Sequence, residues 1–240
     1  NNPPKTTAVS DPISGDVRGL FSGGTLAVEA YLALQPLLEG LTSNVAPMPA
    51  QQPADLWQSA GHTILDLGED EFTQGRLHPM MDNTLLLRRL AQEATDPATG
   101  IILLDVVLGV GAHPDPASEL APAIAAVREK RPSLPILALV VGNDSDPQNA
   151  SEQASQLASA GAIVCHTVQE LVEQVNDRLP LPPASRTSPT LKAGFTAINV
   201  GLESFQESIV AQGGTAVHVD WRPPAGGNEK LMSILAKFKK

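Results

Sequence analysis

The sequence predicts a parallel α/β domain, an open and mainly parallel sheet with helices on both faces, followed by a smaller β-α-β unit. Two observations support this prediction. Short apolar runs alternate with segments of helical length through residues 15–180, which is the pattern of consecutive βαβ units. The segment from Gly100 to Val107 is almost continuously apolar, as in a strand that helices bury on both faces.

The expected elements follow one another in a regular order. Val17 to Phe21 forms the first strand, Ser22 to Thr25 a tight turn, and Leu26 to Leu34 a helix with apolar residues at helical spacing. Further strands are expected at 62–67, 100–107, 135–141 and 162–165, and further helices at 83–94, 117–130, 150–160 and 168–178. The proline-rich residues 42–53 are expected to form a surface excursion. Right-handed crossovers place the strand-to-helix loops at one edge of the sheet, where such folds bind ligands.

Four segments are expected along the chain. Residues 1–14 are polar and proline-containing, as in a lead-in, and the proline-rich residues 181–190 are typical of a linker. Residues 15–180 form the main domain. Residues 191–240 form a β-α-β segment that is too small to stand alone, so we expect it to dock on the main sheet or on a partner. Because the chain starts without an initiator Met or a signal pattern, we expect a piece of a longer protein.

Composition excludes several classes of function. The formal net charge is −10, with 26 acidic residues against 16 Lys and Arg, so nucleic acid is not an expected partner. The single cysteine, Cys165, permits no intramolecular disulfide, and we expect a packed core thiol and a cytoplasmic protein. The apolar runs are far shorter than the roughly 20 residues that span a bilayer, so no membrane association is expected.

The turn Ser22-Gly23-Gly24-Thr25 is the first candidate site. It joins a strand to a helix, so its backbone N–H groups are suited to hold a phosphate or a carboxylate. A plain structural turn explains the same residues equally well, since the sequence lacks the Lys of a nucleotide-binding loop. Asn143, in the loop at 142–148 after another strand, is assigned to the same anion-binding set.

The loop at residues 68–82 concentrates acids with an Arg and a His. Arg76 is a candidate clamp for a carboxylate or phosphate, and His78 a candidate proton shuttle near neutral pH. Asp82 is expected to cap the following helix. No ligand spacing typical of a metal site occurs, so no metal is predicted.

Two further polar residues lie beside the most buried strand. His113 follows that strand and is a third candidate catalytic residue, although Pro114 and Pro116 also suit an ordinary capped turn. Asp105 lies within the apolar run itself. A buried carboxyl group must be paired or have a raised pKa, so a polar partner is expected nearby.

Several motifs resemble a known family of ligases. Ser22 to Ala30 resembles the entry to the second domain of succinyl-CoA synthetase α subunits. Segments 61–68, 78–80, 111–116 and 219–227 are similar to the FdrA family, which is related to those subunits. The resemblance implies a flavodoxin-like domain. In the synthetases this domain carries a phosphorylated histidine, and an N-terminal domain binds CoA. The corresponding loop here, 142–148, contains no histidine, and Asp105 is only a loose counterpart of the glutamate that orients it.

The resemblance also implies a function. We expect a fragment or subunit of an FdrA-type acyl-CoA synthetase-like protein, a component of an acyl- or carbamoyl-transferring enzyme such as the oxamate carbamoyltransferase of allantoin breakdown. It would bind a small anionic substrate. We expect no cofactor in this fragment, and CoA would bind only through an N-terminal domain that is absent here.

Two alternatives stay open, namely a conventional acyl-CoA synthetase and a noncatalytic assembly subunit. Aromatic and Arg side chains are typical anchors of protein interfaces. Trp221 and Arg222 are therefore the candidate interface residues of a homo-oligomer or of a hetero-oligomer with partner enzyme subunits.

Overall fold

The computed structural model describes residues 14–179, 196–200, 203–211 and 213–219. The chain divides into two compact units, with the division between Ala184 and Ser185. The larger unit holds the predicted α/β domain and the smaller one a short β-α-β unit. In the described residues, no helix is long and apolar enough to cross a membrane.

The sheet of the larger unit has six strands in the order β2-β3-β1-β4-β5-β6, and all its pairings are parallel. The strands are β1 (Asp16–Phe21), β2 (Thr42–Ser43), β3 (Thr63–Asp66), β4 (Thr99–Val107), β5 (Ile136–Val141) and β6 (Ile163–Cys165). The helices are α1 (Gly24–Leu34), η1 (Pro49–Gln51), α2 (Asp70–Thr73), α3 (Thr84–Thr95), α4 (Pro116–Lys130), α5 (Ala150–Ser159) and α6 (Val168–Asn176). Without the edge strand β2, this is the flavodoxin-like strand order. The predicted fold class is confirmed.

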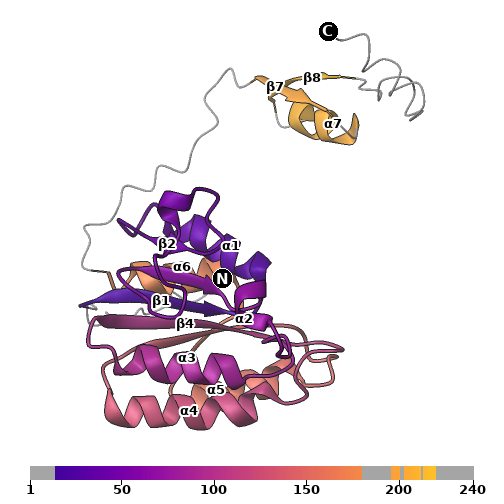
Figure 1. Cartoon of the computed structure of the whole chain (residues 1–240). Coiled ribbons are helices and arrows are strands. Elements are labelled where there is room, and N and C mark those ends of the chain that lie inside the picture. The colour runs from indigo at the N-terminus through magenta and orange to yellow at the C-terminus, as the bar shows by residue number, and fades with distance from the viewer. Residues whose placement is uncertain (1–13, 180–195, 201–202, 212, 220–240) are drawn as a thin grey trace. The chain divides into compact units, whose positions relative to one another are not determined.

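Helices cover both faces of this sheet (Figure 1). Helices α3, α4 and α5 pack on one face through Leu90, Ile124 and Leu157, and the other face is covered by α1 and α6 through Leu34 and Leu171. All five of these side chains are fully buried. The double cover explains why β4 is apolar along its whole length, since a strand in the middle of such a sheet has no face in water.

Three of the helices, α4, α5 and α6, begin at a residue whose side chain accepts a hydrogen bond from one of the first N–H groups. Asp115 accepts a hydrogen bond from Ser118 N at the start of α4, and Pro116 occupies the first turn. Thr167 caps α6 in the same way by accepting from Glu170 N. Asp82, the predicted cap of α3, lies one position before the N-cap Asn83, whose own side chain makes no capping bond, and Oδ1 of Asp82 accepts from Thr84 N at 2.8 Å.

A buried charge cluster, Arg18, Arg89, Glu93 and Asp96, connects α3 to β1. Oε1 of Glu93 lies 2.6 Å from Nη2 of Arg89, and its Oε2 lies 3.3 Å from Nε of Arg18. The Arg18 guanidinium also lies 3.1 Å from the Asp96 carboxylate. The side chains of Arg18, Arg89 and Glu93 are at most 3% exposed. The carboxylate of Glu93 is therefore shared by two buried cations.

The structure differs from the sequence prediction in residues 42–81. Residues 42–53 were predicted as a surface excursion, but Thr42 and Ser43 form the edge strand β2 because Thr42 N donates to His62 O at 3.0 Å. The loop at 68–81 contains the short helix α2, which buries Phe72 against the edge of the Trp57 ring, 4.9 Å away between centroids. Two-residue strands and single-turn helices carry too little periodicity to be predicted.

Cys165 is the packed core thiol that the sequence predicts. Its side chain is 1% exposed at the end of β6. Burial raises the pKa of the thiol to about 11, and the nearby Glu170 carboxylate contributes in the same direction. A nucleophilic role requires the thiolate, so Cys165 is not a candidate catalytic residue.

The smaller unit consists of β7 (Thr196–Asn199), α7 (Glu203–Ala211) and β8 (Thr215–His218), with β7 and β8 parallel. It confirms the predicted C-terminal β-α-β unit. The candidate interface residues Trp221 and Arg222 lie outside the described residues.

Candidate functional site

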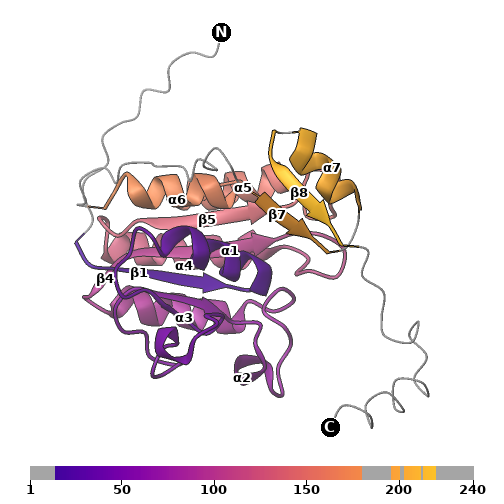
Figure 2. The same ribbon diagram turned by 90° about the horizontal axis from the view of Figure 1, so that it is seen from above.

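The strand order reverses between β1 and β4, and this place is the topological switch point of the sheet, here called the switch point. Helix α1 leaves β1 toward one face, and α4 leaves β4 toward the other. The strands point the same way, as the arrows of β1 and β5 show in Figure 2. Open α/β sheets bind ligands at the carboxyl end of such a switch. The loops after β1, β3 and β4 therefore form the candidate site.

Asp105 finds its polar partner in the turn after β1. Its carboxyl group is 1% exposed and accepts hydrogen bonds from Ser22 N at 2.6 Å and from Gly23 N at 3.1 Å. Burial raises the pKa of Asp105 to about 6, although these bonds and one from the Ser22 hydroxyl oppose the rise. Asp105 thus accepts the hydrogen bonds of the Ser22 and Gly23 N–H groups. In the predicted anion-binding turn this leaves the N–H groups of Gly24 and Thr25, which donate no hydrogen bond to any described residue.

Asp66 lies at the end of β3, beside the start of α1. A Cβ at Gly24 would lie 2.7 Å from Oδ2 of Asp66, so a side chain at this position would force the Asp66 carboxyl group to shift. Oδ1 of Asp66 accepts a hydrogen bond from Gly68 N at 2.8 Å. Burial raises the pKa of Asp66, while the Gly68 bond and the charge of His78 act in the opposite direction. The switch point thus holds two carboxyl groups with raised pKa values, those of Asp66 and Asp105.

His78 joins these acids at the end of β3. A Cβ at Gly68 would lie 2.6 Å from Nε2 of His78 and 3.0 Å from Oδ1 of Asp66, so both groups border the same point. Nδ1 of His78 accepts a hydrogen bond from Met80 N at 3.2 Å. In the neutral ring the proton therefore sits on Nε2, next to Asp66. This arrangement suits a proton donor that is held by its own loop.

His113 contacts the same loop but faces another carboxylate. Its backbone N–H donates to Met80 O at 2.7 Å, so Met80 connects the loops that carry His78 and His113. Nδ1 of His113 accepts from Asp115 N, and Nε2 lies 3.5 Å from Oε1 of Glu119. The structure brings the two predicted histidines into neighbouring loops, with one imidazole beside Asp66 and the other beside Glu119.

Arg76 does not join the two histidines. It is exposed, and its guanidinium carbon lies 5.8 Å from the centre of the Trp57 ring, which Arg88 also contacts at 5.2 Å. It borders a separate pocket of about 460 Å³ together with Asp82 and Arg88. The aromatic contact accounts for its position.

Asn143 lies in a loop that is closed by its own hydrogen bonds. Its Oδ1 accepts from Ser145 N at 2.8 Å, and its N–H donates to Oδ2 of Asp146 at 2.7 Å. The buried amide of Gln148 then binds the backbone of Gly109 through both of its ends. The loop at 142–148 is therefore attached to the loop after β4.

Two contributors to this region were not predicted, Asp66 and Gln148. An acid that ends an apolar run at a strand terminus was an available signal for Asp66. Gln148 carries no signal in the sequence, because its partners Gly109 and His113 lie at least 35 positions away. Among residues 14–179 and the described part of the smaller unit, no group of three or more potential ligands is placed to hold a metal ion.

Comparison with known proteins agrees with the fold. The uncharacterized protein YahF of Escherichia coli (strain K12) is 41% identical in an alignment of 154 residues that covers 62% of this chain. The chain spans only 30% of the length of that relative. The family model described as CoA-ligase matches residues 20–176, from β1 to the end of α6. This range includes the switch point and most of the larger unit, and the chain belongs to the CoA-ligase family.

Proposed function

We propose that the chain is a piece or subunit of an acyl-CoA synthetase-like protein that transfers acyl or carbamoyl groups without a phosphohistidine of its own. Its substrate would be a small anion bound at the switch point, with carbamoyl phosphate and oxamate as the specific candidates. Membership of the CoA-ligase family supports the acyl-CoA synthetase-like class. The FdrA-type activity is the finer part of the proposal.

The arrangement of Asp66, Asp105 and His78 around the turn after β1 carries this proposal. The N–H groups of Gly24 and Thr25 begin an 11-residue helix, and such groups favour a negatively charged oxygen. Nε2 of His78 borders the same region beside Asp66. A proton on this ring would stabilise the negative charge that develops on a leaving oxygen.

The loop after β5 supports transfer without phosphohistidine. Residues 142–148 contain no imidazole. Asn143 and Asp146 are engaged in the closed turn described above. A relay through phosphohistidine needs a ring nitrogen as the nucleophile, and this loop offers none.

Isothermal titration of the full chain with carbamoyl phosphate, oxamate and CoA tests the substrate. We expect binding of carbamoyl phosphate or oxamate, weakened at least tenfold by His78→Gln and by Gly24→Ala, because the added methyl group would displace Asp66. The exposed His166 provides the matched control, and His166→Gln should bind as the unchanged chain does. Absence of binding to all three compounds would refute the proposal. Acid-labile phosphate on the protein after incubation with ATP would favour a conventional synthetase.

A second proposal assigns assembly to the smaller unit. Ile198 of β7 and Val217 of β8 pair across the small sheet and are both exposed, at 74% and 55%. We propose that this unit docks a partner subunit, with Trp221 and Arg222 as further anchors. Light scattering of Ile198→Ser/Val217→Ser and of Trp221→Ala/Arg222→Ala should show a smaller assembly than the unchanged chain. An unchanged mass for both double variants would count against this role.

A further inference from the structure

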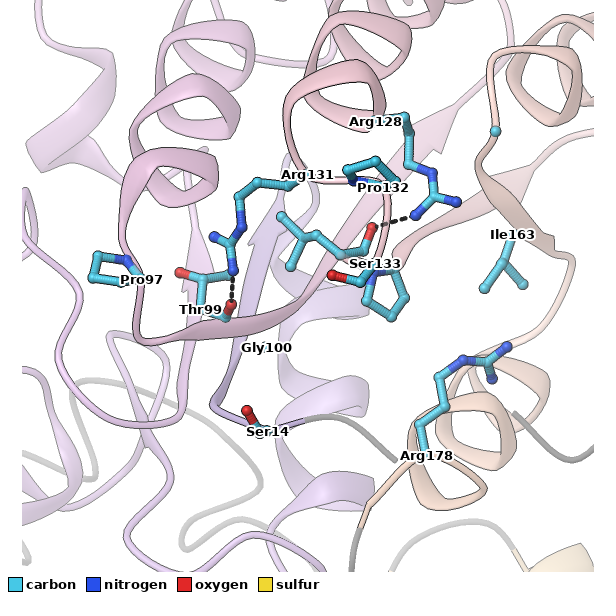
Figure 3. A pocket seen from close by; sticks show the side chains of 13 residues that line it. Ser14, Pro97, Thr99, Gly100, Arg128, Arg131, Pro132, Ser133, Ile163 and Arg178 are labelled. Carbon is cyan, nitrogen blue, oxygen red and sulfur yellow. Dashed lines mark hydrogen bonds between the residues drawn. The ribbon is translucent and has the colours of Figure 1, made fainter. Parts of the chain in front are cut away.

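A pocket of about 490 Å³ lies at the amino ends of β4, β5 and β6, the edge of the sheet opposite the switch point (Figure 3). Arg128, Arg131 and Arg178 all line it, and we call it the arginine pocket. Its volume is within the range of pockets that bind small molecules and cofactors. Its position separates it from every residue of the site described above.

Backbone carbonyl groups hold two of the three arginines in place. Arg131 donates from Nη1 to Ala94 O and Asp96 O, and from Nη2 to Thr99 O at 2.7 Å. Arg128 donates from Nη1 to Leu134 O at 2.9 Å. Neutral acceptors orient a guanidinium group without cancelling its charge. These two side chains are therefore positioned and still carry a full positive charge.

Arg178 supplies the third charge from the end of α6. Its Nη1 donates to the backbone and side-chain oxygens of Gln174, one helical turn earlier, at 2.8 and 2.7 Å. Figure 3 shows Arg178 on the side of the pocket away from Arg131, near Ile163. These bonds stay within one helix, so Arg178 contributes less to the fold than Arg131 does.

The arginine pocket concentrates three positive side chains in one place, although the chain has a net charge of −10. Among the described residues, its lining contains no acidic side chain and none of its three arginines forms an ion pair. Asp96, which interacts electrostatically with Arg131, is already bonded by Arg18. The C-terminal ends of helices carry a partial negative charge, which explains why cations gather here. Each helix end offsets only about half of one positive charge.

The remaining walls of the arginine pocket are stiff and partly apolar. Pro97, Pro132 and Pro135 line it, together with Ile163. Proline fixes its backbone φ angle and so reduces the ordering that a ligand must impose. A pocket with a rigid wall and three cations suits a molecule that combines a compact body with concentrated negative charge.

We propose that the arginine pocket binds a phosphorylated small molecule that carries at least two negative charges. Planar guanidinium groups with free N–H donors match phosphate oxygens in geometry as well as in charge. The ligand is either a nucleotide, which would also use the proline wall, or a phosphate chain alone. This inference is independent of the proposed function, because the two sites lie at opposite edges of the sheet.

Isothermal titration of the full chain with inorganic pyrophosphate, ADP and uncharged adenosine tests this inference. We expect pyrophosphate and ADP to bind, adenosine not to bind, and Arg178→Gln to raise the Kd at least tenfold. Arg178→Lys should retain part of the affinity. Arg88→Gln removes an exposed charge that does not line the pocket and should leave the Kd unchanged. Circular dichroism of each variant verifies that it is folded.

The outcomes separate the two kinds of ligand. A Kd for ADP at least tenfold below that for pyrophosphate identifies a nucleotide, and equal values identify a phosphate chain. The inference is overturned if neither compound binds, or if Arg178→Gln binds as tightly as the unchanged chain. His78→Gln, which tests the switch point, should have no effect on this binding.

Discussion

Glu93→Gln is expected to lower the free energy of unfolding by about 3 to 5 kcal/mol, because it removes the shared anion of a buried charge cluster. The Glu93 carboxylate lies 2.6 Å from Arg89 and 3.3 Å from Arg18, and both guanidinium groups are at most 1% exposed. Asp16 and Asp96, both partly exposed, remain near Arg18. Arg89 would keep only neutral partners, Leu56 O and Ser59 Oγ.

Urea unfolding followed by circular dichroism measures this loss. Glu129→Gln is the matched control, since Glu129 is an exposed glutamate on α4, and its loss should cost less than about 0.5 kcal/mol. A double change, Arg89→Met with Glu93→Leu, should recover part of the stability, since it removes one buried cation together with the anion and leaves Arg18 beside Asp16 and Asp96. A loss below about 1 kcal/mol for Glu93→Gln would show that the cluster is not a stabilising unit.

The contribution of Asp105 to the stability of the chain should rise as the pH falls through about 6. Burial raises the pKa of Asp105 from 3.8 to about 6 in the folded chain. Between these values the folded chain holds a proton that the unfolded chain has released, so unfolding becomes easier as the pH increases. The contribution between pH 8 and pH 4 is on the order of 3 kcal/mol. The raised pKa of Asp66 acts in the same direction.

Comparison with Asp105→Asn isolates this contribution. The amide cannot titrate, and the bond it loses to Ser22 N or Gly23 N costs the same at every pH. The difference in unfolding free energy between the unchanged chain and Asp105→Asn should therefore grow as the pH falls. Glu39→Gln, a change at an exposed acid on the surface, should follow the unchanged chain. Parallel pH profiles for the unchanged chain and Asp105→Asn would contradict the prediction.

The fold was predictable because its main signals are local. The apolar run at 100–107 became β4, and the runs at 135–141 and 162–165 became β5 and β6 with small changes of boundary. Caps such as Asp115 and Thr167 lie three residues from the N–H groups that they bind. Local patterns of this kind are visible in a single sequence.

The site was predictable only in part, because its contacts join distant segments. A partner for Asp105 was expected from burial alone, but Ser22 lies 83 positions away, and no pattern connects the two. Arg76 has the right chemistry for an anion clamp, yet the Trp57 ring holds it elsewhere. The arginine pocket depends on Arg128, Arg131 and Arg178 meeting at the amino edge of the sheet, which requires the strand order to be known.

The two outer strands of the larger sheet have a consequence for assembly. The edge strand β2 has two residues and the edge strand β6 has three. Each edge therefore offers few backbone N–H and C=O groups for pairing with a strand of another molecule. Short edge strands protect a sheet from pairing with the strands of other molecules. An oligomer formed by the larger unit would therefore be held together by helix surfaces or loops, and a continuous sheet across two copies is not expected.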